Sequence, residues 1–253
     1  MSEPKLKMTH VRMFETLASN PDATKSLEKS LLILCTPRCG STLFTEVLNS
    51  TGRLGFCDEW FNYDYFRAWE AVTGLDFELQ PYMNWVMKKT LGNTGVLCIK
   101  WHIGQLVAMN DDHNLGIESM DFDHVIYLYR KDKIAQAVSM AKAVASDQFR
   151  CYEEAPEDPP EIKRQNIAEA LFTIIKFDRF TREYLMRYVD VSYAYEDFQH
   201  FRATSIYNKT LEIFGKPPMA PSELHTRGLK KQRDDQSRWL AGDFIQHITG
   251  AIQ

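Results

Sequence analysis

The segment that decides the fold is residues 30–52, which read SLLILCTPRCGSTLFTEVLNSTG. Residues 31–35 form an apolar run of the length of a buried strand, residues 36–40 resemble a turn, and the apolar spacing over residues 43–48 is helical. A strand, a short loop and a helix in this order direct backbone N–H groups and the positive end of the helix toward one point. The segment therefore predicts a binding site for a phosphate or sulfate group.

The side chains of this loop favour an anion that is held rather than a nucleotide that is hydrolysed. Arg38, Ser41 and Thr42 add one cation and two hydroxyl groups to the predicted site. The pattern Gly-x-x-x-x-Gly-Lys-[Ser/Thr] of ATP-hydrolysing P-loops is absent, because the leading glycine is missing and Ser41 stands where the lysine would fall. The simpler alternative for this loop alone is a strand-to-helix turn with an exposed arginine.

Length and composition are typical of one globular domain that does not bind nucleic acid. The chain has 253 residues, of which 44% are hydrophobic and 25% are charged. We expect a single domain over residues 30–253 and a helical N-terminal extension over residues 1–29. The net charge of −4 argues against a general nucleic-acid binder, which would carry a basic excess.

Cysteine usage and hydropathy predict a cytoplasmic protein without stable membrane insertion. The five cysteines are scattered and form no Cys-x-x-Cys pair, so neither a disulfide framework nor a structural zinc site is indicated. The N-terminus lacks an apolar signal-peptide core, and no run of 18 uncharged apolar residues occurs. The oligomeric state cannot be derived from these features, and a homodimer stays open.

The rest of the chain alternates apolar strands with helices. Continuous apolar runs, which are typical of strands covered on both faces, predict further strands at residues 95–100, 123–130 and 189–195. Helical spacing is found at residues 64–73, 81–91, 132–149, 160–188 and 201–214. This alternation predicts an α/β fold with three layers around a central parallel sheet.

A second arginine and a serine suggest a place for another phosphate. Arg130 ends the predicted strand 123–130, and Ser139 follows nine residues later inside the next helix. A strand-end arginine and a hydroxyl two helical turns further on can converge on one phosphate group. The pair by itself is weak evidence, because this spacing is common on protein surfaces.

Together these elements resemble the nucleotide-binding motifs of sulfotransferases that use 3′-phosphoadenosine 5′-phosphosulfate (PAPS). The resemblance implies a P-loop NTPase-like sulfotransferase core and PAPS as the co-substrate, without a metal. It implies that the 5′-phosphosulfate is held by Arg38, Cys39, Gly40, Ser41 and Thr42. It further implies that the 3′-phosphate is held by Arg130 and Ser139. Tyr195, in Tyr-Glu-Asp-Phe, and the basic segment Lys230, Lys231, Gln232 and Arg233 resemble further cofactor-binding elements of this superfamily.

Within the superfamily the sequence resembles most the Stf0 group of bacterial carbohydrate sulfotransferases. The likeness spans about residues 31–240 and lies in Arg-x-Gly-Ser-Thr-Leu, Glu59-Trp60-Phe61, Gln-x-Val-Ser and the late Lys-Gln…Ser…Trp. It implies a small-molecule acceptor with a hydroxyl group, such as a sugar or a glycolipid. The chain departs from many sulfotransferases at Arg38, where they have lysine, and residues 1–29 lie outside the match.

Four residues are the candidates for catalysis. Sulfuryl transfer to an alcohol needs a base near the hydroxyl and cations near the leaving phosphate. The resemblance offers Glu59 and His102 as alternative bases, with Glu59 slightly preferred, and implies that Lys100 and Arg38 stabilise the leaving oxygen. An aromatic group follows Glu59 and is interpreted either as an acceptor wall or as core. Its members are Trp60, Phe61, Tyr63, Tyr65, Phe66 and Trp69.

Two other functions compete with sulfuryl transfer. A kinase on a related core would need a lysine in the phosphate loop and ligands for Mg²⁺, and that lysine is absent. A non-catalytic nucleotide-binding relative would not need Lys100 and two candidate bases, all of which are present. Both alternatives stay open at the level of the sequence.

Overall fold

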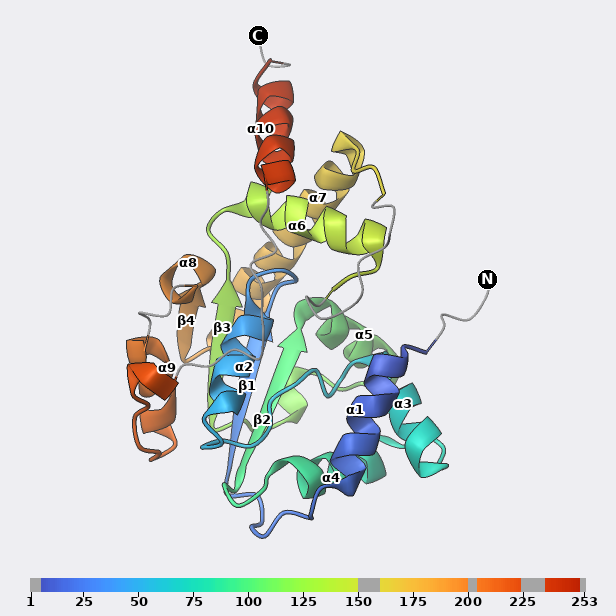
Figure 1. Cartoon of the computed structure of the whole chain (residues 1–253), viewed down its shortest axis with the longest axis vertical. Coiled ribbons are helices and arrows are strands. Elements are labelled where there is room, and N and C mark those ends of the chain that lie inside the picture. Colours follow the sequence, from blue (N-terminus) through green and yellow to red (C-terminus); the bar gives the residue numbers. More distant parts are fainter. Residues whose placement is uncertain (1–5, 150–159, 200–203, 224–234, 251–253) are drawn as a thin grey trace.

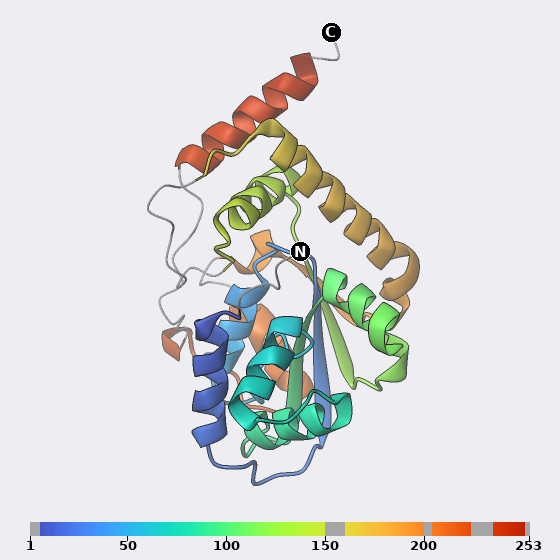
Figure 2. The same cartoon turned by 90° about the vertical axis from the view of Figure 1, so that its right-hand side faces the viewer.

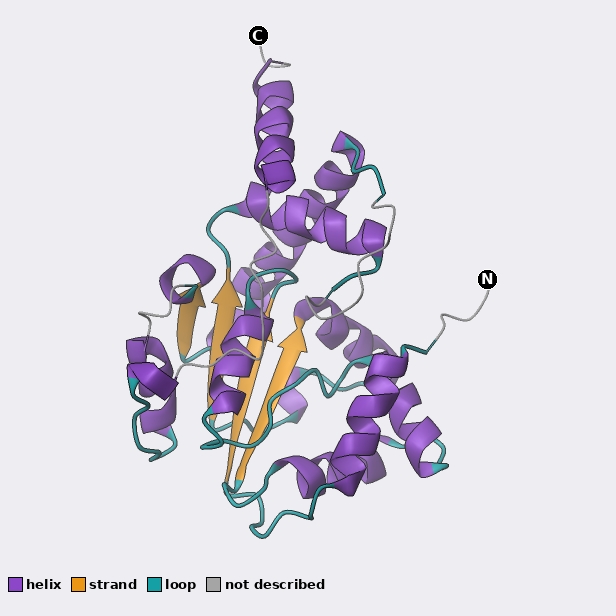
Figure 3. Ribbon diagram, in the orientation of Figure 1, coloured by secondary structure: helices purple, strands orange, loops and turns teal. Residues whose placement is uncertain are grey.

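A four-stranded parallel sheet forms the centre of the protein (Figure 3). The computed structural model describes residues 6–149, 160–199, 204–223 and 235–250. The sheet consists of β1 (Lys29–Cys35), β2 (Val96–His102), β3 (His124–Tyr129) and β4 (Val191–Ala194). Their order is β2-β1-β3-β4, and each neighbouring pair is parallel. The prediction of an α/β fold around a parallel sheet is confirmed.

Helices cover both faces of the sheet, and apolar side chains of the two central strands, β1 and β3, are buried on both sides (Figure 1). On one face, Leu31 and Ile33 of β1 pack in a cluster with residues of α2 (Ser41–Ser50) and α9 (Thr204–Ile213). On the other face, Leu32 and Leu34 join a larger cluster. The helices of that cluster are α1 (Met8–Ser19), α3 (Tyr63–Thr73), α4 (Leu79–Thr90) and α5 (Ile103–His113).

The N-terminal helix contributes to the main core. Phe14 and Leu17 of α1 are buried in the cluster that contains Leu32 and Leu34. Phe14 stacks on Trp85 with ring centroids 5.3 Å apart, which fixes α1 against α4. The segment predicted as an extension therefore packs directly on the domain.

A second group of helices lies beyond the carboxyl ends of the strands (Figures 1 and 2). It consists of α6 (Lys133–Ser146), α7 (Arg164–Phe180) and α10 (Asp235–Gly250), which bury a separate apolar cluster. The helix predicted over residues 160–188 is divided, because α7 passes into the π-helix η2 (Thr181–Leu185) and the short 3₁₀-helix η3 (Met186–Tyr188). The sequence did not predict α5 or α10. No helix in the described part of the chain is long and apolar enough to cross a membrane.

The strand order places the candidate residues at one edge of the sheet. From β1 the chain adds β2 on one side of the sheet and then β3 and β4 on the other side. The direction in which successive strands are added therefore switches between β1 and β3. In open parallel sheets, ligands bind outside the carboxyl ends of the strands at such a switch point. The loops after β1 and β3 carry Arg38 and Arg130, and β2 and β4 end near His102 and Tyr195.

Candidate active site

The loop between β1 and α2, residues 36–40, is shaped by two residues with left-handed backbone. Arg38 has φ 61° and Gly40 has φ 83°. A Cβ atom on Gly40 would lie 2.3 Å from Cδ2 of Tyr195, so no other residue fits here without displacing the tyrosine ring. Gly40 thus lets Tyr195 pack directly against the backbone of the loop. We call residues 36–40 the anion loop, after the anion that the sequence predicts it to bind.

A buried glutamine of α6 holds the anion loop in place. The side chain of Gln136 is fully buried, and its Nε2 donates to Thr36 Oγ1 at 3.0 Å and to the Pro37 carbonyl at 2.6 Å. Because a carbonyl accepts only, the orientation of the amide is fixed, and Oε1 has no hydrogen-bond partner within the described chain. Gln136 is the first residue of the Gln-x-Val-Ser pattern, but the sequence predicted no role for it.

Arg38 and Ser139 lie together, although the sequence assigned them to different phosphates. Nε of Arg38 donates to Ser139 Oγ at 3.1 Å, and Nη1 donates to the Phe149 carbonyl at 2.5 Å. The loop arginine and the α6 serine therefore face one another across the carboxyl end of the sheet. Because Ser139 Oγ accepts this hydrogen bond, its own O–H group can still donate to a bound anion.

Arg130 is a buried cation with unused donor capacity. Its side chain is 11% exposed, its guanidinium lies 4.9 Å from the centroid of the Tyr195 ring, and the nearest oxygen of Glu196 is 4.0 Å from Nε. Nε is buried and makes no hydrogen bond to any described residue. An unpaired buried donor of this kind is costly, and an anion is the natural partner for it.

Glu196 is occupied mainly with the backbone that leads into α6. Its two carboxylate oxygens accept from the N–H groups of Lys131 and Asp132 at 3.0 and 3.1 Å. Asp132 in turn caps α6 by accepting from the Ala135 N–H at 2.9 Å. The Tyr195–Glu196 element thus holds both the anion loop and the start of α6.

The second half of the site is an ion-pair cluster at the end of β2. Residue 58 forms an isolated parallel bridge with Ile99, which places Glu59 beside the last residues of that strand. Nζ of Lys100, which is 1% exposed, lies 2.9 Å from Glu59 Oε1. Nε2 of His102 is 3.4 Å from the same oxygen. The structure therefore brings together Glu59, Lys100 and His102, three of the four candidate catalytic residues.

Two amides complete the binding of the Glu59 carboxylate. Asn62 Nδ2 and Gln105 Nε2 donate to Oε2 at 3.1 and 3.0 Å. A carboxylate has about four lone-pair positions, and here each oxygen faces two donors. We call Glu59, Lys100, His102, Asn62 and Gln105 the carboxylate cluster. The sequence did not predict the roles of Asn62, which caps α3 three residues after Glu59, and of Gln105, which reaches Glu59 from α5.

Both ring nitrogens of His102 are engaged inside the protein. Nε2 faces Glu59, and Nδ1 lies 3.3 Å from Sγ of Cys35 at the end of β1. The strand register places Cys35 directly opposite His102. The sequence did not predict this contact, although Cys35 and His102 each end a predicted strand or follow one closely.

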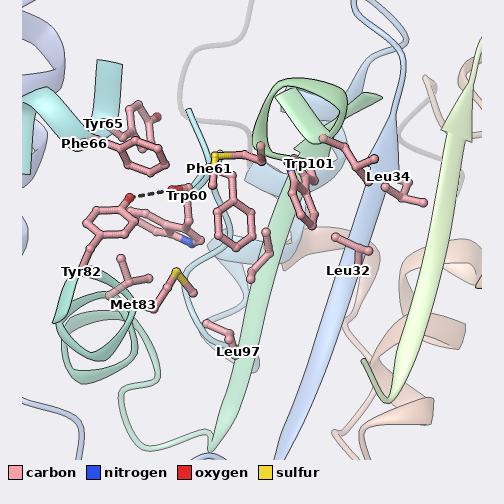
Figure 4. Packing of buried hydrophobic residues seen from close by; sticks show 14 of the residues in the cluster. Leu32, Leu34, Trp60, Phe61, Tyr65, Phe66, Tyr82, Met83, Leu97 and Trp101 are labelled. Carbon is pink, nitrogen blue, oxygen red and sulfur yellow. Dashed lines mark hydrogen bonds between the residues drawn. The ribbon is translucent and has the colours of Figure 1, made fainter. Parts of the chain in front are cut away.

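The aromatic group after Glu59 belongs mostly to the core (Figure 4). Its buried members, with 0 to 3% of their surface exposed, are Trp60, Phe61, Tyr65, Phe66 and Trp69. Trp60 Nε1 donates to the Cys98 carbonyl at 3.1 Å, and the Tyr82 hydroxyl donates to the Trp60 carbonyl at 2.7 Å. Only Tyr63 of this group is exposed, at 37%, and its hydroxyl contacts Asp112. Interpreting the group as an acceptor wall is therefore wrong for its buried members.

Some predicted features cannot be placed. Lys230, Lys231, Gln232 and Arg233 lie outside the described residues. Among the described residues, no group of three or more His, Cys, Asp or Glu side chains is arranged to hold a metal ion. The described cysteines Cys35, Cys39, Cys57 and Cys98 are free thiols.

The fold and site define an α/β protein with an arginine in the loop after its first strand and a second arginine at the adjacent strand end. The chain belongs to the Stf0 sulphotransferase family, whose profile matches residues 30–242. The reaction class is therefore sulfuryl transfer, and the predicted family is confirmed.

The comparisons with individual proteins are more distant. A sulfotransferase domain from the olefin synthase of Synechococcus PCC 7002 has a similar structure, with a TM-score of 0.43 and 14% sequence identity. The similarity covers 87% of this chain and 96% of that domain. No match was found among curated proteins.

Proposed function

We propose that this protein transfers the sulfuryl group of PAPS to a hydroxyl group of a carbohydrate or glycolipid by in-line displacement. The observation that carries the proposal is the buried Nε of Arg130, at the strand end next to the anion loop, which makes no hydrogen bond to any described residue. PAPS carries a 3′-phosphate in addition to its 5′-phosphosulfate, so it needs two anion sites. A nucleotide with a single phosphate chain would leave the Arg130 donor unpaired.

The residues that fit the donor come from three of the strand ends. The backbone and side chains of residues 38–42 would hold the 5′-phosphosulfate. Arg130 and Ser139 would hold the 3′-phosphate, with the Tyr195 ring, whose centroid lies 4.9 Å from the Arg130 guanidinium, supporting that arginine. The segment Lys230–Arg233 remains the family's expected contribution to cofactor binding. When bound, PAPS supplies a sulfuryl group whose bond to the phosphate oxygen is activated for displacement.

The protein residues act on the hydroxyl proton and on the leaving oxygen. We assign Glu59 as the general base, as the family resemblance prefers, and His102 as its neighbour, with Nε2 3.4 Å from Glu59 and Nδ1 3.3 Å from Cys35. The acceptor oxygen forms a bond to sulfur, the sulfur–oxygen bond to the phosphate breaks, and the hydroxyl proton passes to Glu59. Lys100 and Arg38 stabilise the negative charge on the leaving phosphate oxygen.

Lys100 has two roles in this proposal. In the unliganded protein it neutralises Glu59 at 2.9 Å, which allows both charges to be buried. When a phosphosulfate is present, the ammonium group moves to the leaving oxygen and one position on the carboxylate becomes available for the acceptor hydroxyl. Loss of the neighbouring cation also makes Glu59 a stronger base, since an opposite charge favours the ionised carboxylate.

The free thiols of the four described cysteines support a reducing, cytoplasmic location for this reaction.

The experiment that tests the function is an acceptor screen with ³⁵S-labelled PAPS against monosaccharides, disaccharides and glycolipids. We expect label on at least one acceptor with wild type and a loss of most of it with Glu59→Gln. Absence of transfer to every acceptor, together with Mg²⁺-dependent consumption of ATP, would contradict the proposal and favour a kinase.

A further inference from the structure

A cysteine thiol and a histidine ring meet where two neighbouring strands end. Cys35 and His102 are register partners at the carboxyl ends of β1 and β2. Sγ of Cys35 lies 3.3 Å from Nδ1 of His102 and 3.8 Å from the Trp101 carbonyl oxygen. The imidazole nitrogen is therefore nearer to the thiol than the Trp101 carbonyl oxygen is, and the side chains of Cys39 and Ser41 are further hydrogen-bonding neighbours of Cys35.

The state of the thiol decides what it can do. The side chain of Cys35 is fully buried. Burial raises the pKa of the Cys35 thiol well above its ordinary value, and the adjacent Cys39 thiol acts in the same direction. A raised thiol pKa means that the proton stays on sulfur at neutral pH. Cys35 is thus a thiol that can donate a hydrogen bond, and not a thiolate nucleophile.

The other ring nitrogen faces a group that can only accept. Nε2 of His102 lies 3.4 Å from Oε1 of Glu59, an oxygen that also lies 2.9 Å from the Lys100 ammonium. An ionised carboxylate has no proton to donate. If the neutral ring carried its proton on Nδ1, a lone pair on Nε2 would point at the carboxylate. The thiol and the carboxylate therefore favour the same tautomer from opposite sides of the ring.

We propose that Cys35 is a positioning residue of the active site. Its S–H group donates to Nδ1 of His102 and fixes the neutral ring as the Nε2–H tautomer, so that His102 is a permanent donor to Glu59. The catalytic meaning of this inference rests on the proposed role of Glu59 as the base.

The Nε2–H tautomer of His102 would keep Glu59 in place during the proposed reaction. Once Lys100 moves to the leaving oxygen, Glu59 Oε1 loses its closest donor. His102 then remains as the donor that holds Oε1, while Asn62 and Gln105 hold Oε2. A histidine that rotated or changed tautomer would release the carboxylate when it has to receive the proton. Cys35 prevents this by occupying the far side of the ring.

Nuclear magnetic resonance of the unliganded protein tests the inference directly. Long-range ¹H–¹⁵N correlation spectra distinguish protonated from unprotonated ring nitrogens, and His102→Gln identifies the signals of this residue among the seven histidines. At a pH where the ring is neutral, we expect wild type to show a proton on Nε2 only. Cys35→Ala should give a mixture of both tautomers, whereas Cys35→Ser, which keeps a donor, should retain the wild-type pattern. Cys98→Ala serves as the control for loss of a buried thiol on β2, and it should leave the signals of His102 unchanged.

Release of sulfate from PAPS to water gives the functional readout. We expect Cys35→Ala to lower kcat about tenfold, equivalent to about 1.4 kcal/mol, the scale of one neutral hydrogen bond. Cys35→Ser should recover most of this loss. A proton on Nδ1 in wild type, or an unchanged spectrum in Cys35→Ala, would overturn the inference. Because the spectra need neither PAPS nor an acceptor, an inactive wild type with the expected tautomer would refute the proposed function and leave the positioning of His102 standing.

Discussion

The anion loop and the carboxylate cluster lie at the ends of neighbouring strands, but they satisfy their charges in opposite ways. At the carboxylate cluster, one glutamate faces four donors, of which Lys100 is the closest. On the anion side, Arg38 donates to neutral oxygens of Ser139 and Phe149, and Arg130 keeps a buried donor without a hydrogen bond in the described chain. In the first region Lys100 pairs with Glu59 and also lies 3.7 Å from Asp58. In the second region the buried Nε of Arg130 can accept a further anion as its hydrogen-bond partner.

This difference indicates the order of events at the site. In the proposed reaction, the anion side gains most from a ligand that carries negative charge, so nucleotide binding comes first. The carboxylate cluster then stays closed until a competing anion draws Lys100 away from Glu59. In this order, Glu59 becomes available as a base only when the sulfuryl donor PAPS is bound.

The largest effect is expected from removing the base. Glu59→Gln keeps the shape of the side chain but cannot accept a proton, and kcat should fall by about 10²–10⁴-fold. His102→Ala should cost less, about tenfold, because it acts through Glu59. Steady-state transfer assays with both variants measure this. An equal loss in both variants, or a larger loss with His102→Ala, would reverse the assignment of base and positioning residue.

A smaller effect, on stability and nucleotide binding together, is expected at Gly40. Gly40→Ala combines a left-handed backbone with a Cβ atom 2.3 Å from Tyr195, so it should destabilise the fold by about 1–3 kcal/mol and displace the ring that supports Arg130. Gly52→Ala is a matched control, because Gly52 also has a positive φ of 59° but no neighbouring atom within 4 Å of the added carbon. Chemical denaturation compares the two variants. Equal losses would show that backbone strain alone, and not Tyr195, explains the glycine.

The smallest of these effects concerns Gln136. Gln136→Leu removes the donor to Thr36 and Pro37 and leaves two buried acceptors unpaired, at a cost of about 1–3 kcal/mol. We expect weaker binding of 3′,5′-ADP, measured by calorimetry, with little change in kcat at saturating PAPS. Gln165→Leu on the exposed face of α7 is the control and should bind normally. Unchanged affinity in Gln136→Leu would mean that the anion loop keeps its shape without α6.

Much of the fold followed from local patterns, whereas the finer contacts of the site did not. The apolar runs predicted all four strands, and the turn after residue 35 predicted the loop, because strand and helix periodicities are local properties of the sequence. The Arg38–Ser139 contact and the Cys35–His102 pair depend on which strands are neighbours and in which register. A single sequence does not contain that information in any local window.

The structure decides between the two interpretations of the aromatic group. Trp60 and Trp69 follow a candidate catalytic residue, so both an acceptor wall and the core were open at the level of the sequence. Both are buried beneath the site, against β2 and α4. Proximity in sequence to Glu59 therefore did not mean proximity to solvent, because the chain turns into α3 and its large side chains fill the core.

The proposal that Arg130 binds the 3′-phosphate of PAPS is tested by comparing the thermal shifts that 3′,5′-ADP and ATP produce. The account predicts a rise of several degrees in the melting temperature with saturating 3′,5′-ADP, a much smaller rise with ATP, and loss of the 3′,5′-ADP effect in Arg130→Ala. Equal stabilisation of wild type by both nucleotides, or an undiminished 3′,5′-ADP shift in Arg130→Ala, would contradict it.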